Sequence, residues 1–375
     1  MYTVESVASG HPDKIADQIS DFLLDYFLGK NSNAHVAVEC MVSKDIIIIS
    51  GEVGGVEYDI QKIQYMVLDF IDHKQLSNLG FHRSNLKVLV YLHGQSREID
   101  SSVTMNDGAG DQGIVFGYAE DTTTHYMPIA IHYAHSILRN IENAIITGKL
   151  KGLRKDAKSQ VTFSENGDFV STLVLSIQHD VSVSVENVLL MLMPYIRETF
   201  GRLFKEDETE VLINPSGSFI EGGPSADCGL TGRKIIIDSY GAGIPHGGGA
   251  FSGKDPTKID RSAAYFARYL CKNIVASGLA GKCLMSIAYV IGLSNPVDIT
   301  LQTYGTSSVS EGRILAYLRE NIDFSVIGII NTLNLRRPIY MQTSVYGHFG
   351  RDISDGNEGF SWECLDMVET LKKIL

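Results

Sequence analysis

The feature that most constrains the fold of this chain is an order of helix, strand, strand and helix that occurs three times along its 375 residues. Apolar residues three and four apart indicate the helices, and short runs rich in β-branched residues indicate the strands. The copies start about 120 residues apart, which is close to ordinary domain size. The expected segments are 13–28, 34–42, 45–53 and 58–71, then 126–146, 159–165, 169–179 and 185–200, and finally 260–278, 282–292, 297–305 and 310–321.

This order predicts an α+β fold of three structurally similar units, each a mostly antiparallel sheet covered by helices on one face. No side-chain identity is visible between the copies, so three unrelated pieces are the alternative. We expect an N-terminal unit at 1–100, a central unit at 108–221 and a C-terminal unit at 222–375, with approximate borders that can interleave in the fold. The polar region between the first two units, 95–107, is expected to be a mobile loop.

The composition excludes several classes of function. It is 44% hydrophobic and 20% charged, as in ordinary globular proteins. No apolar run is long enough to span a bilayer, and the N-terminal stretch has no apolar core of a signal peptide, so no membrane association is expected. The net charge of −12 disfavours nucleic acid as a partner. The five cysteines are scattered without CxxC spacing, which indicates reduced thiols in the cytoplasm rather than a zinc site.

Basic residues nevertheless crowd two short segments, 154–158 and 233–261, which indicates a compact anionic ligand. The second contains HGGGAFSGKD (246–255), which begins like the phosphate-binding pattern G-x-x-x-x-G-K-[ST]. The pattern fails, because Asp255 stands where a hydroxyl is required and because the expected strand KIIIDSY (234–240) ends well before the glycines. What remains is a glycine run followed by two lysines and an acid, Lys254, Lys258 and Asp260.

That set suits a polyphosphate with a metal ion, since backbone N–H groups of glycines can approach an anion closely. Solvated charges on a surface turn are the alternative. The stretch SGHPDKIAD (9–17) has a similar character: His11 suits a phosphate contact, Asp13 suits Mg²⁺, and Lys14 adds a cation at a helix start that Ser9 or Gly10 is expected to cap. A structural histidine is the alternative for His11.

Three further acidic residues lie in contexts that favour a ligand. Asp111 stands between glycines in GAGDQG, where the backbone permits close approach. Glu39 and Glu52 lie in or beside strands rich in β-branched residues, and Glu39 is expected to be costly to bury without a cation.

Taken together, these segments resemble the S-adenosylmethionine synthetase (methionine adenosyltransferase) family. The resemblance rests on HPDKIADQISD, GAGDQGIVFGYA, LRKDAKSQVTF, INPSGSFIEGGPSADCGLTGRKIIIDSYG and HGGGAFSGKDPTKIDRSAAYFARY, and runs in order from about Glu5 to Gly350. It implies that ATP and L-methionine react to S-adenosylmethionine, phosphate and diphosphate. The methionine sulfur would attack C5′ of ATP, and the displaced triphosphate would then be hydrolysed.

The resemblance also implies residue roles. His11 would lie at the junction of O5′ and the triphosphate, and the cations that neutralise the triphosphate would be Lys158, Arg233, Lys234 and Lys254. Asp156, Ser218, Phe219, Asp227 and Ala250 would line the nucleotide site, with Phe219 stacked on adenine. The methionine contacts would be Glu52, Gln95, Asp111, Asp227 and Lys258.

The implied metals are two Mg²⁺, held by Asp13 and Asp260, and one K⁺ at Glu39. The family's active site is shared across a homodimer, and bacterial members are commonly dimers of dimers. This sequence departs from the family in a gating loop after Gln95 that is about four residues shorter, and in Ser218 and Pro245, where Arg is frequent. Another Mg²⁺-dependent ATP phosphotransferase and a non-catalytic nucleotide-binding member are the alternative functions.

Overall fold

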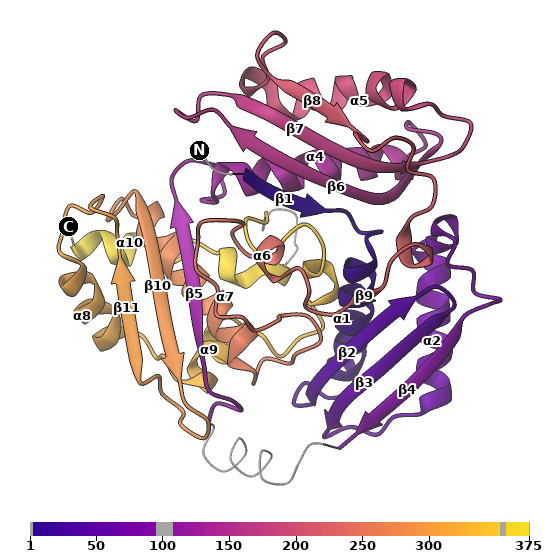
Figure 1. The fold of residues 1–375 in the computed structure, drawn as a ribbon. Helices are drawn as coiled ribbons and strands as arrows, with labels where there is room; N and C mark the ends of the chain where they lie inside the picture. Colours follow the sequence, from indigo (N-terminus) through magenta and orange to yellow (C-terminus); the bar gives the residue numbers. More distant parts are fainter. Residues whose placement is uncertain (1–2, 95–107, 353–357, 375) are drawn as a thin grey trace.

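The computed structural model describes residues 3–94, 108–352 and 358–374, and their strands form three small sheets (Figure 1). The loop expected at 95–107 lies outside the described residues, as does Gln95. In the part of the chain that is described, no helix combines the length and the apolar character that crossing a membrane requires.

The first sheet contains, in spatial order, β9 (Gly229–Leu230), β2 (His35–Ser43), β3 (Ile46–Gly54) and β4 (Lys87–His93). Helices α1 (Pro12–Lys30) and α2 (Ile60–His73) pack on it. The apolar residues that predicted α1, spaced four apart, are all fully buried: Ile15, Ile19, Leu23 and Phe27. Every second residue of β2 is buried as well, so the helices cover one face and leave the other uncovered.

The second sheet contains β1 (Thr3–Val7), β6 (Leu153–Phe163), β7 (Val170–His179) and β8 (Glu210–Ile213), with α4 (Ile129–Ile146) and α5 (Val185–Phe200) packed on it. The third contains β11 (Asp298–Gln302), β10 (Lys282–Tyr289) and β5 (Gly113–Glu120), with α7 (Ile259–Ala276) and α8 (Glu311–Asn321). Strand pairs are antiparallel except β3 with β4 and β7 with β8, which are parallel. The expected α+β class with three similar, mostly antiparallel units is confirmed.

The remaining helices are short. They are α6 (Ile235–Asp238), α9 (Val326–Thr332) and α10 (Val368–Leu371), with 3₁₀ turns at Leu76–Leu79, Gly201–Leu203, Gly223–Ser225, Met341–Thr343, Glu358–Glu363 and Lys372–Ile374. In Figure 1 the three sheets lie around a centre that holds α6.

The strand that precedes each unit's first helix belongs to another unit's sheet. β1 precedes α1 but pairs with β6, β5 precedes α4 but pairs with β10, and β9 precedes α7 but pairs with β2. Each unit thus gives one strand to the next in a closed cycle. The contiguous borders 1–100, 108–221 and 222–375 therefore do not follow the sheets.

The expected strand at 234–240 is wrong, since this segment forms the short helix α6. Its two ends are both bound to the start of α1, Lys234 to Asp13 and Asp238 to Lys14. Asp13 and Lys14 are neighbours, whereas four residues of extended strand cover about 13 Å and one helical turn covers about 6 Å. Only the helical turn brings both ends to adjacent partners.

Candidate active site

His11 is the N-cap of α1, so the expectation that Ser9 or Gly10 caps this helix is wrong. Its Nδ1 accepts the backbone N–H of Asp13 at 3.2 Å, and only 3% of the residue is exposed. Burial, reinforced by the charge of Lys234, lowers the pKa of His11 to about 4. The ring is therefore neutral at pH 7, and because Nδ1 accepts a hydrogen bond, its proton lies on Nε2. His11 is a neutral donor at the mouth of a helix N-terminus.

Asp13 is a buried carboxylate placed between basic side chains. It accepts from the Lys234 ammonium at 2.5 Å and from the N–H of Leu230 at 3.0 Å, and Arg233 lies 3.6 Å away. Burial alone would raise its pKa, but the hydrogen bonds from Lys234 and Leu230 more than offset this and lower the pKa. Asp13 is thus ionised.

Asp156 and Lys158 lie two residues apart on β6, close to His11. Asp156 accepts the N–H of Gly223 at 2.7 Å, and burial raises its pKa to about 6. Lys158 lies on the uncovered face of the sheet, makes no ion pair within the described residues, and helps to lower the pKa of His11. The exposed carboxylate of Asp227 acts on His11 in the opposite direction. We call His11, Asp13, Asp156, Lys158, Asp227, Arg233 and Lys234 the α1 cluster.

Phe219 and Ser218 lie on the loop that follows β8. The backbone of Phe219 is fixed from both sides by His179, whose N–H donates to its carbonyl at 2.9 Å and whose Nε2 accepts its N–H at 3.1 Å. Phe219 is half-buried and Ser218 is exposed. These bonds fix the backbone that carries the aromatic ring, and the ring itself is not enclosed.

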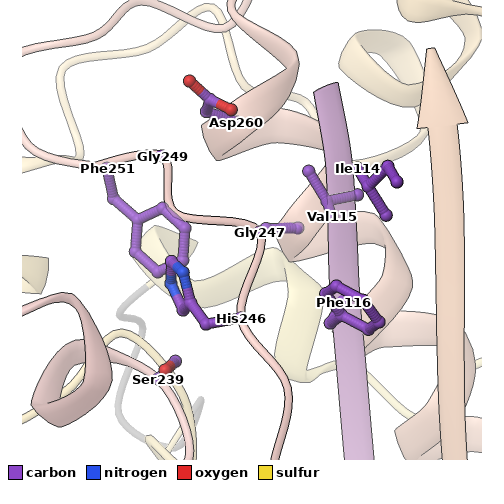
Figure 2. Close-up of a pocket in the computed structure, with 10 residues that line it drawn as sticks. Ile114, Val115, Phe116, Ser239, His246, Gly247, Gly249, Phe251 and Asp260 are labelled. Carbon is purple, nitrogen blue, oxygen red and sulfur yellow. The ribbon is translucent and has the colours of Figure 1, made fainter. Parts of the chain in front are cut away.

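A second group surrounds the glycine run. Lys254 donates to Asp260 at 2.7 Å, and both side chains are about a quarter exposed (23% and 25%). A Cβ on Gly249 would lie 2.2 Å from the Asp260 carboxyl carbon, so a side chain at this position would displace the Asp260 carboxylate. Figure 2 shows Asp260 at the rim of a narrow pocket between the glycine run and the β5 residues 114–116. We call Ala250, Lys254, Lys258 and Asp260 the glycine cluster.

Asp255, the residue that departs from the phosphate-binding pattern G-x-x-x-x-G-K-[ST], has a structural role. It is fully buried, accepts the N–H of Val36 at 2.6 Å and the N–H of Thr257 at 2.8 Å, and so joins this turn to β2. Its carboxylate also binds the Lys258 ammonium at 2.6 Å. Lys258 is thereby held at the start of α7, 17% exposed.

The two clusters lie along the same edge of the first sheet. Leu230, held by Asp13, is paired with Met41 of β2, and Lys254 forms a bridge to Ala37. Four residues of strand separate these points by about 13 Å. The structure thus brings most of the expected phosphate-binding residues to one side of the molecule, in two groups rather than one.

Besides Ser218 and Phe219, three expected residues lie outside both clusters. Glu39 is exposed on the uncovered face of β2, so the argument that it is costly to bury is wrong, and its K⁺ role rests on the resemblance alone. Glu52 is half-exposed on the neighbouring β3, and Asp111 is exposed just before β5, where it caps the N–H of Gln112 at 2.7 Å.

Lys14 does not belong to a phosphate site. It is fully buried and donates to Asp17 at 2.9 Å and to Asp238. Sequence reasoning also missed Asp17 and Asp21, which hold the two cation-bearing segments in place. The available signal was the spacing of four between Asp13, Asp17, Asp21 and Asp25, which lies beside the apolar spacing that predicted the helix.

The carboxylates fit Mg²⁺ that is bound together with a polyphosphate. Within the described ranges, no three His, Cys, Asp or Glu side chains gather into a metal cage. Asp13 and Asp260 are each a single carboxylate beside a lysine. Mg²⁺ is usually held by one or two carboxylates, with phosphates and water completing its shell, and this donor set matches that pattern.

Comparisons with known proteins agree with the motifs. Family models of the N-terminal, central and C-terminal domains of S-adenosylmethionine synthetase match residues 1–97, 106–219 and 221–364. Proteins named S-adenosylmethionine synthase from Paracoccus denitrificans, Methylobacterium nodulans and Pelagibacter ubique are 47%, 46% and 44% identical to this chain. Each alignment covers 100% of this chain and 98% of the relative.

Proposed function

This chain belongs to the S-adenosylmethionine synthetase family, and we propose that the α1 cluster and the glycine cluster together form the active site of that activity. Its activity is that of an S-adenosylmethionine synthase, an adenosyl transferase whose substrates are ATP and L-methionine. The observation that carries the site proposal is that Lys234 binds Asp13 and Lys254 binds Asp260 at the same edge of the first sheet, with the neutral ring of His11 beside Asp13.

The chemistry requires stabilisation of a leaving group more than activation of a nucleophile. A thioether sulfur has a free electron pair, so it needs no general base. As the S–C5′ bond forms, the C5′–O5′ bond breaks and the triphosphate leaves with O5′. Water then splits the triphosphate into phosphate and diphosphate. Negative charge develops on the triphosphate, and preorganised donors and cations around it lower the barrier.

His11 is proposed as the donor to the bridging oxygen O5′. Its neutral ring carries a proton on Nε2, and Nδ1 is already held by the N–H of Asp13, so the donor direction is fixed before substrate arrives. The Nε2 proton of the neutral ring is not bound to a carboxylate in the described residues, so it can donate directly to the developing charge.

The triphosphate cations are proposed to be Lys158, Arg233, Lys234 and Lys254. Lys234 and Lys254 are each bound to one carboxylate, Asp13 and Asp260. We propose that these two carboxylates hold two Mg²⁺, which when bound would neutralise phosphate charge, and that both lysines then turn to the phosphates. A K⁺ at Glu39 is proposed from the resemblance.

The residues around the organic parts of the substrates are proposed from the resemblance. The nucleotide side is proposed to comprise Asp156, Ser218, Phe219, Asp227 and Ala250, with adenine stacked on the ring of Phe219. The methionine side is proposed to comprise Glu52, Gln95, Asp111, Asp227 and Lys258. Gln95 lies outside the described residues.

We propose that the site is completed by a second copy of the chain, in a homodimer or a dimer of dimers. The uncovered sheet faces carry exposed apolar side chains, including Tyr91 (61%), Ile114 (51%) and Leu230 (39%). Lys158, Glu39 and Glu52 lie on the same uncovered faces. A cytoplasmic location is also proposed, and the five free cysteines support it.

The assignment of His11 is tested by following products of the purified protein with ATP, Mg²⁺ and K⁺, with and without L-methionine. We expect methionine-dependent S-adenosylmethionine with equimolar phosphate and diphosphate, and a loss of at least about 100-fold in His11→Ala. His82→Ala, at an exposed histidine, is the control. Near-normal turnover in His11→Ala would contradict the role of His11, and formation of ADP would favour a phosphotransferase. The comparisons contain nothing that favours either alternative function.

A further inference from the structure

A short turn, residues 8–10, leads from β1 into His11, and β6 holds both of its ends. The first N–H of the turn donates to the carbonyl of Ala157 at 2.9 Å, and the last donates to the carbonyl of Lys155 at 3.2 Å. These two carbonyls flank Asp156. The backbone that precedes His11 is therefore tied to the strand that carries part of the proposed nucleotide site.

The middle residue of this turn, Ser9, is bound by a buried acid. Glu142 on α4 accepts the Ser9 hydroxyl at 2.5 Å with one carboxylate oxygen and the Ser9 N–H at 3.3 Å with the other. The Ser9 carbonyl accepts the side-chain amide of Gln18 at 2.8 Å. Both Ser9 and Glu142 are only 9% exposed. Every polar group of Ser9 thus has a fixed partner, and its hydroxyl binds α4 instead of capping α1.

Glu142 is itself held by the C-terminal unit. Tyr346 donates its hydroxyl to the carboxylate oxygen that also accepts the Ser9 N–H. Tyr346 is buried, and its backbone is left-handed, with φ of 59°. This conformation is unfavourable for a large side chain, so the surrounding fold has to maintain it. One carboxylate thus joins α4, the C-terminal unit and the turn that precedes His11.

Glu142 is separated from the substrate side of the sheet. It lies on α4, which packs on the covered face of the second sheet, whereas Lys158 lies on the uncovered face. Any effect of Glu142 on the reaction therefore passes through the turn. His11 depends on that turn, because its N–H donates to the carbonyl of Ala8 at 3.1 Å.

We propose that Glu142 is a positioning residue for His11, which fixes Ser9 and thereby the direction in which the Nε2 proton of His11 points. The inference rests on the proposed role of His11 as the donor to O5′. It concerns residues of a single chain, so it holds whichever chain supplies the glycine cluster. A misplacement of about 1 Å is enough to cost on the order of 100-fold in rate.

The test measures kcat and the KM for ATP in S-adenosylmethionine formation by Glu142→Ala and Glu142→Gln. Glu142→Ala should lower kcat at least about 10-fold and leave KM within about 3-fold of the parent, because a donor to the leaving oxygen acts mainly in the transition state. Glu142→Gln should keep kcat within about 3-fold of the parent. Its amide oxygen still accepts the Ser9 N–H and the Tyr346 hydroxyl, and its NH₂ group donates to the Ser9 oxygen.

Ser6→Ala is the matched control. The Ser6 hydroxyl also joins the N-terminal segment to α4, through Nδ1 of His135 at 2.7 Å, and both residues are buried. Ser6 lies on β1, outside the turn, so Ser6→Ala should lower the unfolding temperature without changing kcat or KM. If Glu142→Ala does not fold, Ser9→Ala takes its place, since it removes the 2.5 Å bond and keeps the bond between the carboxylate and Tyr346.

A double-mutant cycle with His11→Ala shows whether the effect passes through His11. In the His11→Ala protein, the additional change Glu142→Ala should lower kcat by less than about 2-fold, because the group that Glu142 positions is already absent. The inference is overturned if Glu142→Ala, or Ser9→Ala in its place, keeps the parent kcat, if its loss is the same with and without the His11 imidazole, or if Ser6→Ala loses as much. If His11→Ala itself keeps full turnover, the proposed function of His11 is what fails.

Discussion

Asp156 is a side chain of the candidate site whose ionised form destabilises the folded protein. One carboxylate oxygen accepts the N–H of Gly223, while the other is buried without a hydrogen-bond partner in the described part of the chain. Burial raises the pKa of Asp156 to about 6, from an ordinary value of 3.8. The folded protein therefore binds this proton more tightly than the unfolded chain does, and ionised Asp156 destabilises the fold.

This predicts a pH-dependent gain in stability for Asp156→Asn, which keeps an acceptor for Gly223. Below pH 3.8 the acid is protonated in both states and the gain is absent. It develops between pH 3.8 and 6, where the unfolded chain has lost the proton and the folded protein keeps it, and it is complete above pH 6. Between pH 4 and pH 8 the unfolding free energy of Asp156→Asn should rise by about 2 to 3 kcal/mol relative to the parent.

Denaturant unfolding at both pH values, with exposed Asp168→Asn as the control, measures this difference. A constant difference across the pH range would show that Asp156 is not the group described. Activity of Asp156→Asn should fall, because the carboxylate lies beside Lys158 in the proposed nucleotide site.

For individual residues, the sequence predicted the chemical role better than it predicted the burial and the partners of the side chain. His11, Asp13, Lys234 and Lys254 could be selected because their types and neighbours suit a polyphosphate. The burial of Lys14 and the exposure of Glu39 could not be predicted, because both depend on segments more than a hundred residues away or on which face of a strand the helices cover. A side chain's partner across the fold is not a local property.

At the scale of elements, periodicity predicted the long helices and the paired strands, because one buried face imposes a regular apolar spacing. The helix expected at 185–200 is observed as Val185–Phe200. Elements too short to show an apolar periodicity were missed or misassigned. β9 has only two residues, and α6 is a single turn held by ion pairs at both ends. Long-range bonds, rather than local preference, decide the shape of such segments.

The contact between β5 and α7 gives a prediction at this scale. A Cβ on Gly117, in the middle of β5, would lie 2.1 Å from the backbone carbonyl carbon of Ala267 on α7. Since backbone cannot yield as a side chain does, Gly117→Ala should destabilise the protein by about 3 kcal/mol or prevent folding.

Gly312→Ala is the matched control, because a Cβ there meets nothing within 4 Å and the residue lies inside helix α8. It should stabilise the protein by about 0.5 to 1 kcal/mol. Thermal unfolding of both variants tests the contact, and equal stability of the two would refute the close approach of β5 to α7.

At the scale of the whole molecule, the closed exchange of strands explains why three small sheets form one body. No unit completes its sheet without a strand from another, so the units are expected to unfold together. The sequence showed three similar units but could not show this exchange, because pairing between β1 and β6 joins residues about 155 positions apart.

At this scale we propose that one active site combines the α1 cluster of one chain with the glycine cluster of its partner. Each cluster alone carries only part of the charge that a triphosphate requires, and both lie beside uncovered, partly apolar sheet faces. A site of this kind can be reassembled from two chains that are each inactive, provided that their defects lie in different clusters.

The measurement that tests this most directly is S-adenosylmethionine formation after His11→Ala and Lys254→Ala chains are unfolded together and refolded as a mixture. Each variant alone should be inactive. In a mixed dimer one of the two sites receives both intact residues, so the mixture should recover about a quarter of the parent activity, with equimolar phosphate and diphosphate. A mixture as inactive as its components, in which mixed dimers are shown to have formed, would contradict a shared site.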